Sequence, residues 1–155
     1  MQGFTKRELI GSLFCPALTI LWGGVRFLVD LTCGLKFTGE GSFRLTAIFA
    51  VFIGGILPVI LTLTHKIHTE QYLKKRIITI IAVYVANGFI GLFGNGVTML
   101  ALYMIVGIGA VLFQILKIQD ENTLGKERVV LILSDPIVYW TIYWFIFWFT
   151  EFLEI

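Results

Sequence analysis

His65 and His68 lie three residues apart with Glu70 close by, a spacing that suggests half of a metal site. Structural zinc is almost always held by four ligands. The chain has no further histidine, and its two cysteines, Cys15 and Cys33, are remote in the sequence. We therefore expect no metal here, and the sequence indicates no other cofactor.

Basic side chains surround the two histidines. Clusters of Lys and Arg beside a membrane span are typical of surfaces that attract anionic lipid. A partner protein could use the same charges. We expect a cytoplasmic surface for lipid or for a partner protein, made of His65, Lys66, His68, Lys74, Lys75 and Arg76.

Arg26 and Asp30 lie four residues apart near the end of a long apolar run. On a helix this spacing places both side chains on one face, where they can satisfy each other's charge. Charged residues inside a span are costly and commonly functional. A helix that ends near Val25 would instead make the pair an anchor at the membrane interface, with Arg26 extending toward water. Both interpretations remain open.

Asn87 and Gln114 are the other strongly hydrogen-bonding side chains within apolar runs. An amide in lipid needs a partner, so both should face protein or water. They would then either hold neighbouring helices together or form the polar lining of a pore or cavity.

No catalytic set accompanies these residues. The sequence has no recognisable Ser–His–Asp or Cys–His set, phosphate-binding loop or zinc motif. Because the roles of an active site are unfilled, we expect that the protein is not an enzyme. A net charge of +2, without a basic patch outside short loops, also argues against nucleic-acid binding.

The composition sets the fold class. The chain has 155 residues, of which 57% are apolar and 14% charged. Soluble domains have about 45–50% apolar and about 25% charged residues. No charged residue occurs from Ile77 to Leu116. These features exclude a soluble globular domain and a disordered chain, and they predict an all-α integral membrane protein.

A spanning helix needs about 20 apolar residues to cross a hydrocarbon core of about 30 Å. We expect one membrane domain over residues 1–155. The run from Ile77 to Leu116 would be about 60 Å long as one helix, so it must turn back, at Gly94-Asn95-Gly96. The four predicted spans are residues 9–29, 46–64, 77–94 and 97–116.

A fifth, aromatic-rich helix is predicted at residues 136–153, where Ser134 and Asp135 before Pro136 form a helix start. It either spans the membrane or lies in the interface. Its aromatic residues recur every four positions, so they share one broad face. That face is formed by Tyr139, Trp140, Tyr143, Trp144 and Trp148, together with Phe147.

Two roles are open for this face. Trp and Tyr favour the membrane interface, which suggests lipid anchoring. A single copy would leave these rings exposed to lipid, whereas a second subunit would provide close ring contacts. We therefore expect a homo-oligomer with the aromatic face at its subunit interface.

Positive charge in short loops sets the orientation of the chain. Nine of the twelve Lys and Arg fall on one side of the predicted spans. We expect this side, with the N-terminus and the 65–76 loop, to be cytoplasmic, in a bacterial inner membrane. The nine are Lys6, Arg7, Lys66, Lys74, Lys75, Arg76, Lys117, Lys126 and Arg128.

Two stretches carry a resemblance. THKIHTEQYLKKR (Thr64 to Arg76) opens an aliphatic span and a hairpin, and VLFQILKIQDEN (Val111 to Asn122) ends the fourth span in a charged stretch. Over about residues 1–122 this layout resembles the RexB family of phage-exclusion proteins and, by analogy of role, the KwaA membrane subunits of Kiwa anti-phage systems. The aromatic fifth segment departs from the RexB plan. The resemblance implies a membrane sensor or ion-conducting effector, with a cytoplasmic partner if it is Kiwa-like.

The first functional hypothesis is therefore a homo-oligomeric anti-phage membrane protein that senses membrane perturbation or conducts ions. The second is a membrane subunit of a small-solute transporter, in which Arg26, Asp30, Asn87 and Gln114 converge on one cavity. The third is a structural scaffold for another membrane complex.

Overall fold

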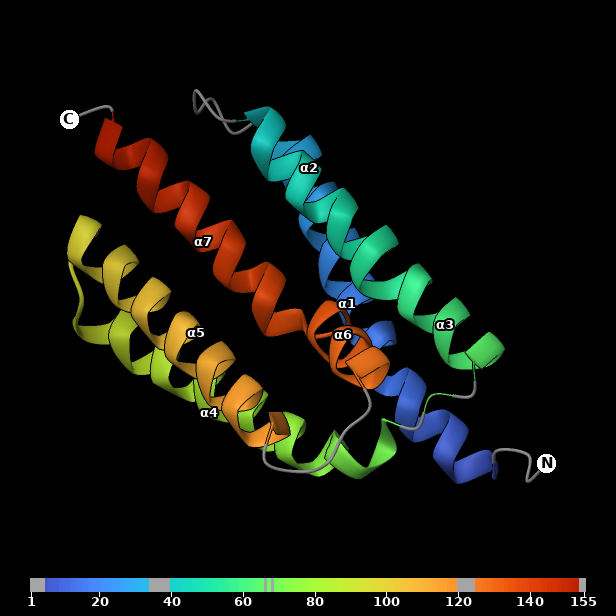
Figure 1. Ribbon diagram of the computed structural model, residues 1–155. Helices are drawn as coiled ribbons and strands as arrows, with labels where there is room; N and C mark the ends of the chain where they lie inside the picture. Colours follow the sequence, from blue (N-terminus) through green and yellow to red (C-terminus); the bar gives the residue numbers. More distant parts are fainter. Residues whose placement is uncertain (1–4, 34–39, 66, 68, 120–124, 154–155) are drawn as a thin grey trace.

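The computed structural model describes residues 5–33, 40–65, 67, 69–119 and 125–153, and every regular element among them is helical (Figure 1). Two short turns of π and 3₁₀ type, η1 and η2, accompany seven α-helices. In chain order the elements are α1 (Lys6–Cys33), α2 (Glu40–Val51), η1 (Phe52–Ile56), α3 (Leu57–His65), η2 (Glu70–Tyr72), α4 (Leu73–Phe93), α5 (Gly96–Gln119), α6 (Gly125–Leu133) and α7 (Pro136–Leu153).

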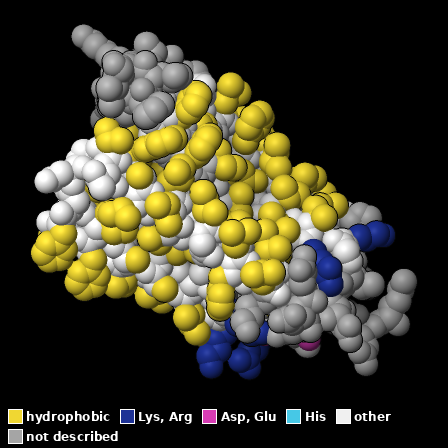
Figure 2. Space-filling view, turned by 60° about the vertical axis from the view of Figure 1, so that its left-hand side comes forward, with side chains coloured by type: hydrophobic (Ala, Val, Ile, Leu, Met, Phe, Trp, Pro, Cys, Tyr) yellow, Lys and Arg dark blue, Asp and Glu magenta, His cyan; other side chains and the backbone are white. Residues whose placement is uncertain are grey.

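The four predicted spans are confirmed as helices long and apolar enough to cross a membrane. They cover Lys6–Thr32, Ser42–Thr64, Glu70–Phe93 and Gly96–Leu116. Their surface is strongly apolar, and basic side chains gather at one end (Figure 2). The chain is therefore an all-α multi-pass membrane protein whose exposed apolar side chains contact lipid.

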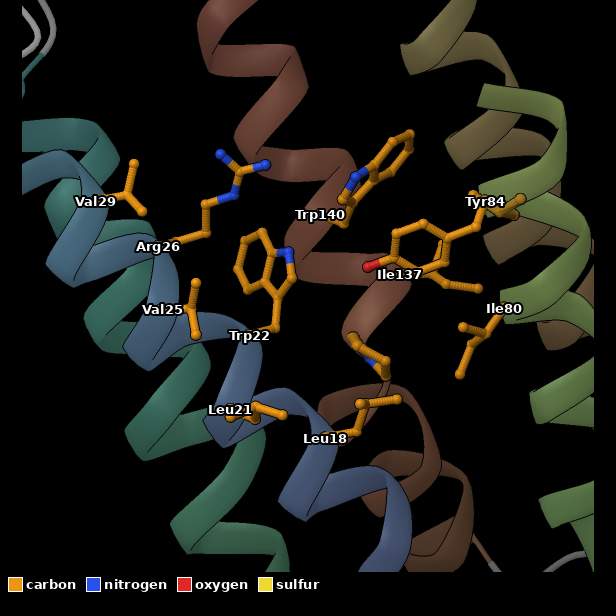
Figure 3. Close-up of a pocket in the computed structure, with 12 residues that line it drawn as sticks. Leu18, Leu21, Trp22, Val25, Arg26, Val29, Ile80, Tyr84, Ile137 and Trp140 are labelled. Carbon is orange, nitrogen blue, oxygen red and sulfur yellow. The ribbon is translucent and has the colours of Figure 1, made fainter. Parts of the chain in front are cut away.

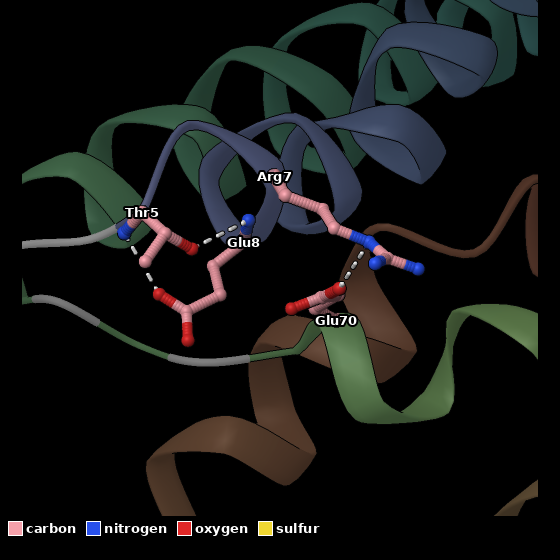
Figure 4. A network of polar contacts seen from close by, with 4 residues as sticks. All are labelled: Thr5, Arg7, Glu8 and Glu70. Atoms are coloured by element: carbon pink, nitrogen blue, oxygen red, sulfur yellow. Dashed lines mark hydrogen bonds and ion pairs between the residues drawn. The ribbon is translucent and has the colours of Figure 1, made fainter.

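The first span starts earlier than its apolar run because polar residues cap α1. The backbone N–H of Glu8 donates to Thr5 Oγ1 (3.3 Å), and the N–H of Thr5 donates to Glu8 Oε2 (2.8 Å) (Figure 4). This reciprocal pair satisfies two amides that a helix start leaves unpaired. Arg7 lies 3.9 Å from Glu70 in the same view, which links α1 to η2 at this exposed end.

The second span is continuous from α2 to α3 but contains the π turn η1. Leu57 N–H donates to the carbonyl of Phe52, five residues earlier. Pro58, which follows, has no N–H and cannot continue the regular α pattern. The widened turn around Gly54-Gly55 is therefore a local change of helix type.

The tight hairpin between α4 and α5 is confirmed at Gly94-Asn95-Gly96. Gly96 has a φ of +47°, a left-handed conformation that glycine adopts without steric cost. The two helices of the hairpin lie side by side (Figure 1).

Helix α7 runs through the middle of the bundle. It packs against α5 on one side and against α2 and α1 on the other (Figure 1). It is preceded by α6, at an angle of 53°, and the two helices together pass the length and composition test for a fifth, broken span or a re-entrant loop. The fifth segment therefore lies alongside the spans and not flat across one end of the bundle.

Close approach of α1, η1 and α7 depends on Gly54. A Cβ atom at this position would lie 2.7 Å from Thr19 Cγ2 and 2.7 Å from Tyr139 Cζ. These distances are too short for carbon atoms, so any side chain would force the helices apart.

We expect Gly54→Ala to lower the free energy of unfolding in detergent by about 1–3 kcal/mol, because the added methyl overpacks this contact. Thermal unfolding of the purified protein measures the effect. Gly24→Ala is the matched control, since nothing lies within 4 Å of a Cβ there. Equal stability of the two variants would show that the helices separate without cost.

Candidate functional site

A buried polar cluster surrounds the break between α6 and α7. Ser134 and Asp135 form this break, and both are buried. Asp135 Oδ1 accepts a hydrogen bond from the N–H of Ile137 at 2.9 Å. Asp135 therefore caps α7, and Pro136 occupies the first helical position, where no N–H is needed. The helix start predicted from these residues is confirmed, and it lies inside the protein.

Arg76 reaches this break from the first turn of α4. Its side chain is only 4% exposed. One guanidinium nitrogen, Nη2, donates to the Leu131 carbonyl (3.2 Å) and to Ser134 Oγ (3.1 Å). From α1, Thr19 Oγ1 donates to the Ser134 carbonyl (2.9 Å). Side chains of two other helices thus satisfy carbonyls that the end of α6 leaves unpaired.

The placement of Arg76 corrects the sequence prediction. We expected it on an exposed surface together with Lys74 and Lys75, but only those two lysines are exposed. Arg76 instead shares the buried face of α4 with Ile80, Val83 and Asn87, because these positions recur with helical spacing. The remaining members of that predicted surface lie outside the described side chains: His65, Lys66 and His68.

Gln114 and Asp135 complete this cluster. The Asp135 carboxylate is close enough to Arg76 and to Gln114 for both to act on it electrostatically. Gln114, from α5, is 8% exposed, and its amide nitrogen has no hydrogen-bond partner within the described part of the chain. Residues of α1, α4, α5 and the α6–α7 break therefore converge on one buried polar group, which we call the inner cluster: Thr19, Arg76, Gln114, Ser134 and Asp135.

Arg26 and Asp30 form a second, outer cluster with Tyr143 of α7. The Tyr143 hydroxyl donates to Asp30 Oδ1 at 2.8 Å, and Arg26 Cζ lies 5.1 Å from the centre of the Tyr143 ring. Asp30 is 3% exposed, so it faces α7 and does not act as an exposed anchor. The ring face stabilises the guanidinium through a cation–π contact.

The four polar residues predicted to share one cavity are divided between these places. Gln114 belongs to the inner cluster, whereas Arg26 and Asp30 belong to the outer one. Asp135 and Tyr143 are eight positions apart, about 12 Å along a helix. Asn87 is buried on α4, and neither atom of its amide has a hydrogen-bond partner among the described residues.

A cavity of about 490 Å³, bounded by α1, α4 and α7, extends between the two clusters (Figure 3). Leu18 lies at one end and Arg26 at the other, with Trp22 and Trp140 between them. Pro136 also lines the cavity. Several lining side chains, including Leu21 and Tyr84, are exposed on the lipid-facing surface. The cavity is therefore mostly apolar, carries one cation, and opens sideways toward the bilayer.

The predicted subunit interface is wrong for three of its residues. Tyr139, Trp140 and Tyr143 are buried within the single chain. The premise that one copy leaves these rings to lipid does not hold, because α7 lies between neighbouring helices. Ring contacts supply much of this packing: Tyr143 lies 5.9 Å from Trp22, and Trp144 lies 5.0 Å from Tyr103.

The outer end of the aromatic face is less enclosed. Trp144 and Trp148 are both partly buried, and Trp148 lies 6.5 Å from Phe145, whose ring is exposed. The structure therefore leaves only this part of the predicted face near lipid.

The chain was also compared with known proteins. No family model, curated protein or solved structure matches it.

The sequence alone does not predict the inner cluster as a unit. The signal that could have found part of it is the spacing of Arg76, Ile80, Val83 and Asn87, which marks one face of α4. No local pattern pairs Gln114 with Asp135, because they lie on different helices and meet only when the bundle assembles.

We expect Arg76→Met to lower the free energy of unfolding by about 3–5 kcal/mol, since it leaves the buried Asp135 carboxylate without an opposite charge. Combining it with Asp135→Ser, which removes the charge and retains a capping oxygen, should cost less than the sum of the two single changes. Unfolding in mixed micelles measures each variant. Lys74→Met is the exposed control, and simple additivity would contradict electrostatic coupling.

Proposed function

We propose that this protein is a non-enzymatic sensor of bilayer perturbation in the bacterial inner membrane, acting in defence against phage. The observation that carries the proposal is the apolar cavity between α1 and α4, open to lipid and lined along α7 by Pro136, Ile137 and Trp140. An acyl chain suits this space because apolar side chains form most of its walls.

The arrangement of helices offers a way to report what fills the cavity. Helix α7 contacts α1 and α2 on one side and α5 on the other. A lipid tail bound between α1 and α4 would favour one distance between the helices on the two sides of α7. A perturbed bilayer changes occupancy, and the population of spacings shifts according to the difference in affinity.

Sensing agrees better with the distribution of polar groups than ion conduction through one chain does. The inner and outer clusters are separated along α7 by Ile137 and Trp140, which are buried among apolar neighbours. A conducting path needs polar groups or water along its length. The described part of the chain offers separate polar groups, the two clusters and Asn87, in place of such a path.

The proposal includes a cytoplasmic N-terminus and a cytoplasmic partner. Lys6 and Arg7 at the start of α1, Lys74 and Lys75 on α4, and Lys126 on α6 lie toward the same end of the helical bundle (Figure 1). The positive-inside tendency assigns this end to the cytoplasm. Their exposed charges suit an acidic partner surface.

Self-association remains part of the proposal, but through a different surface from Tyr139, Trp140 and Tyr143. Phe145 and Phe149 are exposed on α7 and stack with their ring centres 6.2 Å apart. A second copy could bury these rings, which would extend the aromatic packing of α7 between subunits.

A transporter subunit is the second candidate, and the α6–α7 break favours it. Interrupted helices in transporters commonly form solute sites near the middle of the membrane. The buried Arg76, Gln114 and Asp135 beside the break offer both donors and acceptors to a small polar solute.

We expect Val25→Phe to reduce protection of bacteria against phage, because the larger ring fills the cavity that we assign to lipid. Plating efficiency on cells producing each variant measures protection. Leu28→Phe is the matched control, since Leu28 is exposed on α1 and does not line the cavity. If cells that produce the unmutated protein show no protection against any phage of a broad panel, the defence role is contradicted.

Entry of a lipid tail into the cavity can be measured directly in a variant whose only tryptophan is Trp140. Lipids with brominated acyl chains quench tryptophan on contact, and Trp140 is shielded from the outer surface of the bundle. We expect quenching in this variant and weaker quenching after Val25→Phe. If Trp140 is not quenched, lipid tails do not occupy the cavity.

The orientation predicts opposite labelling of two exposed positions. In a background without the native cysteines, Lys74→Cys should react with a membrane-impermeant reagent only after the membrane is opened. Asn95→Cys, in the α4–α5 turn, should react in intact spheroplasts. The reverse pattern would place the N-terminus outside.

A further inference from the structure

A second cavity lies between α4 and α5, next to Arg76 and Gln114 of the inner cluster. Its volume is about 290 Å³. It combines donor groups with apolar walls that continue onto the lipid-facing surface. The lining residues are Tyr72, Lys75, Arg76, Ile78, Thr79, Phe113 and Gln114.

Two side chains lining this cavity have donors without partners. Arg76 Nη2 is used by Leu131 and Ser134, but Arg76 Nε makes no hydrogen bond among the described residues. Gln114 Nε2 is in the same condition, and both side chains are more than nine-tenths buried, at 4% and 8% exposed. Leaving such donors unpaired is costly, so a ligand that brings acceptor oxygens would bind favourably.

The charges around the cavity favour an anion. Lys75 and Arg76 both line it, whereas Asp135, which acts on Arg76 from the inner cluster, is not among the lining residues. The described lining of the cavity therefore carries two cationic side chains and no carboxylate. A phosphate group supplies several acceptor oxygens, and its hydrogen bonds to a guanidinium are charge-assisted and strong.

The apolar walls distinguish a lipid from a free ion. Ile78 and Phe113 line the cavity and are more than half exposed toward the membrane. An acyl chain that extends from a headgroup bound at the donors can lie along these side chains between α4 and α5. The site also includes Lys75, which is exposed with Lys74 at the start of α4, and anionic headgroups gather at such basic side chains.

We propose that this cavity binds the phosphate of an anionic phospholipid, held by Lys75, Arg76 and Gln114, with one acyl chain along Ile78 and Phe113. Such a lipid would hold α4 and α5 to the inner cluster. This site is separate from the cavity between α1 and α4, and its occupancy does not depend on the proposed function.

Native mass spectrometry of the full-length protein, titrated in detergent with phosphatidylglycerol or phosphatidylcholine, tests the proposal. We expect retention of phosphatidylglycerol over phosphatidylcholine. Gln114→Leu should weaken phosphatidylglycerol binding about tenfold, as the loss of a hydrogen bond to a charged group implies. Lys75→Gln should also weaken it, and this change at an exposed side chain avoids disturbing the buried cluster.

Lys74→Gln is the matched control, because Lys74 is exposed beside Lys75 but does not line the cavity. It should leave phosphatidylglycerol binding unchanged. Equal retention of the two lipids, or equal loss in Lys74→Gln and Lys75→Gln, would overturn the proposal. Displacement of the lipid by inorganic phosphate would also overturn it, because it would assign the donors to a soluble anion.

Discussion

Backbone groups at a helix end cannot remain unpaired in a medium without water, and this constraint organises the protein around the break between α6 and α7. The last carbonyls of α6 are reached by Arg76 from α4 and by Thr19 from α1. The start of α7 is capped by Asp135. Because these groups come from different helices, the break fixes where α1 and α4 lie relative to α7.

The two cavities follow from the same arrangement. Because α1 and α4 are both held near the break, a space remains between them next to α7, and this space is the larger cavity. Arg76 uses part of its guanidinium on α6 and presents the remainder toward α5, where the smaller cavity lies. One buried cation thus links the backbone of the break to a site near the lipid surface.

Local sequence signals predicted where the helices lie better than they predicted which helices pack together. Apolar length gave the spans, glycines gave the α4–α5 turn, and Pro136 gave the start of α7. The repeat of Trp and Tyr on α7 correctly placed these rings on one face, but periodicity does not tell whether lipid, a second subunit or another helix covers that face. The structure covers most of it with helices of the same chain.

The polar residues show the same limit. Lys74, Lys75 and Arg76 are consecutive, and their similar chemistry suggested one surface, yet each step along a helix turns about 100°. Arg76 therefore points into the protein while its neighbours remain exposed. The hydrogen bond of Tyr143 to Asp30 and the proximity of Gln114 to Asp135 join distant parts of the chain, so no local spacing could reveal them.

The position of α7 has a consequence for biogenesis. The helix at the centre of the bundle is synthesised after the helices it packs against, α1, α2 and α5. Until α6 and α7 leave the ribosome, Asp30 lacks the Tyr143 hydroxyl, and Arg76 lacks the carbonyl of Leu131. The earlier helices must therefore remain in the bilayer with Asp30 and Arg76 unpaired on their inner faces until α6 and α7 insert. Insertion of the last helix pair closes the bundle and supplies hydrogen-bond partners to both side chains at once, which makes assembly a late and cooperative step.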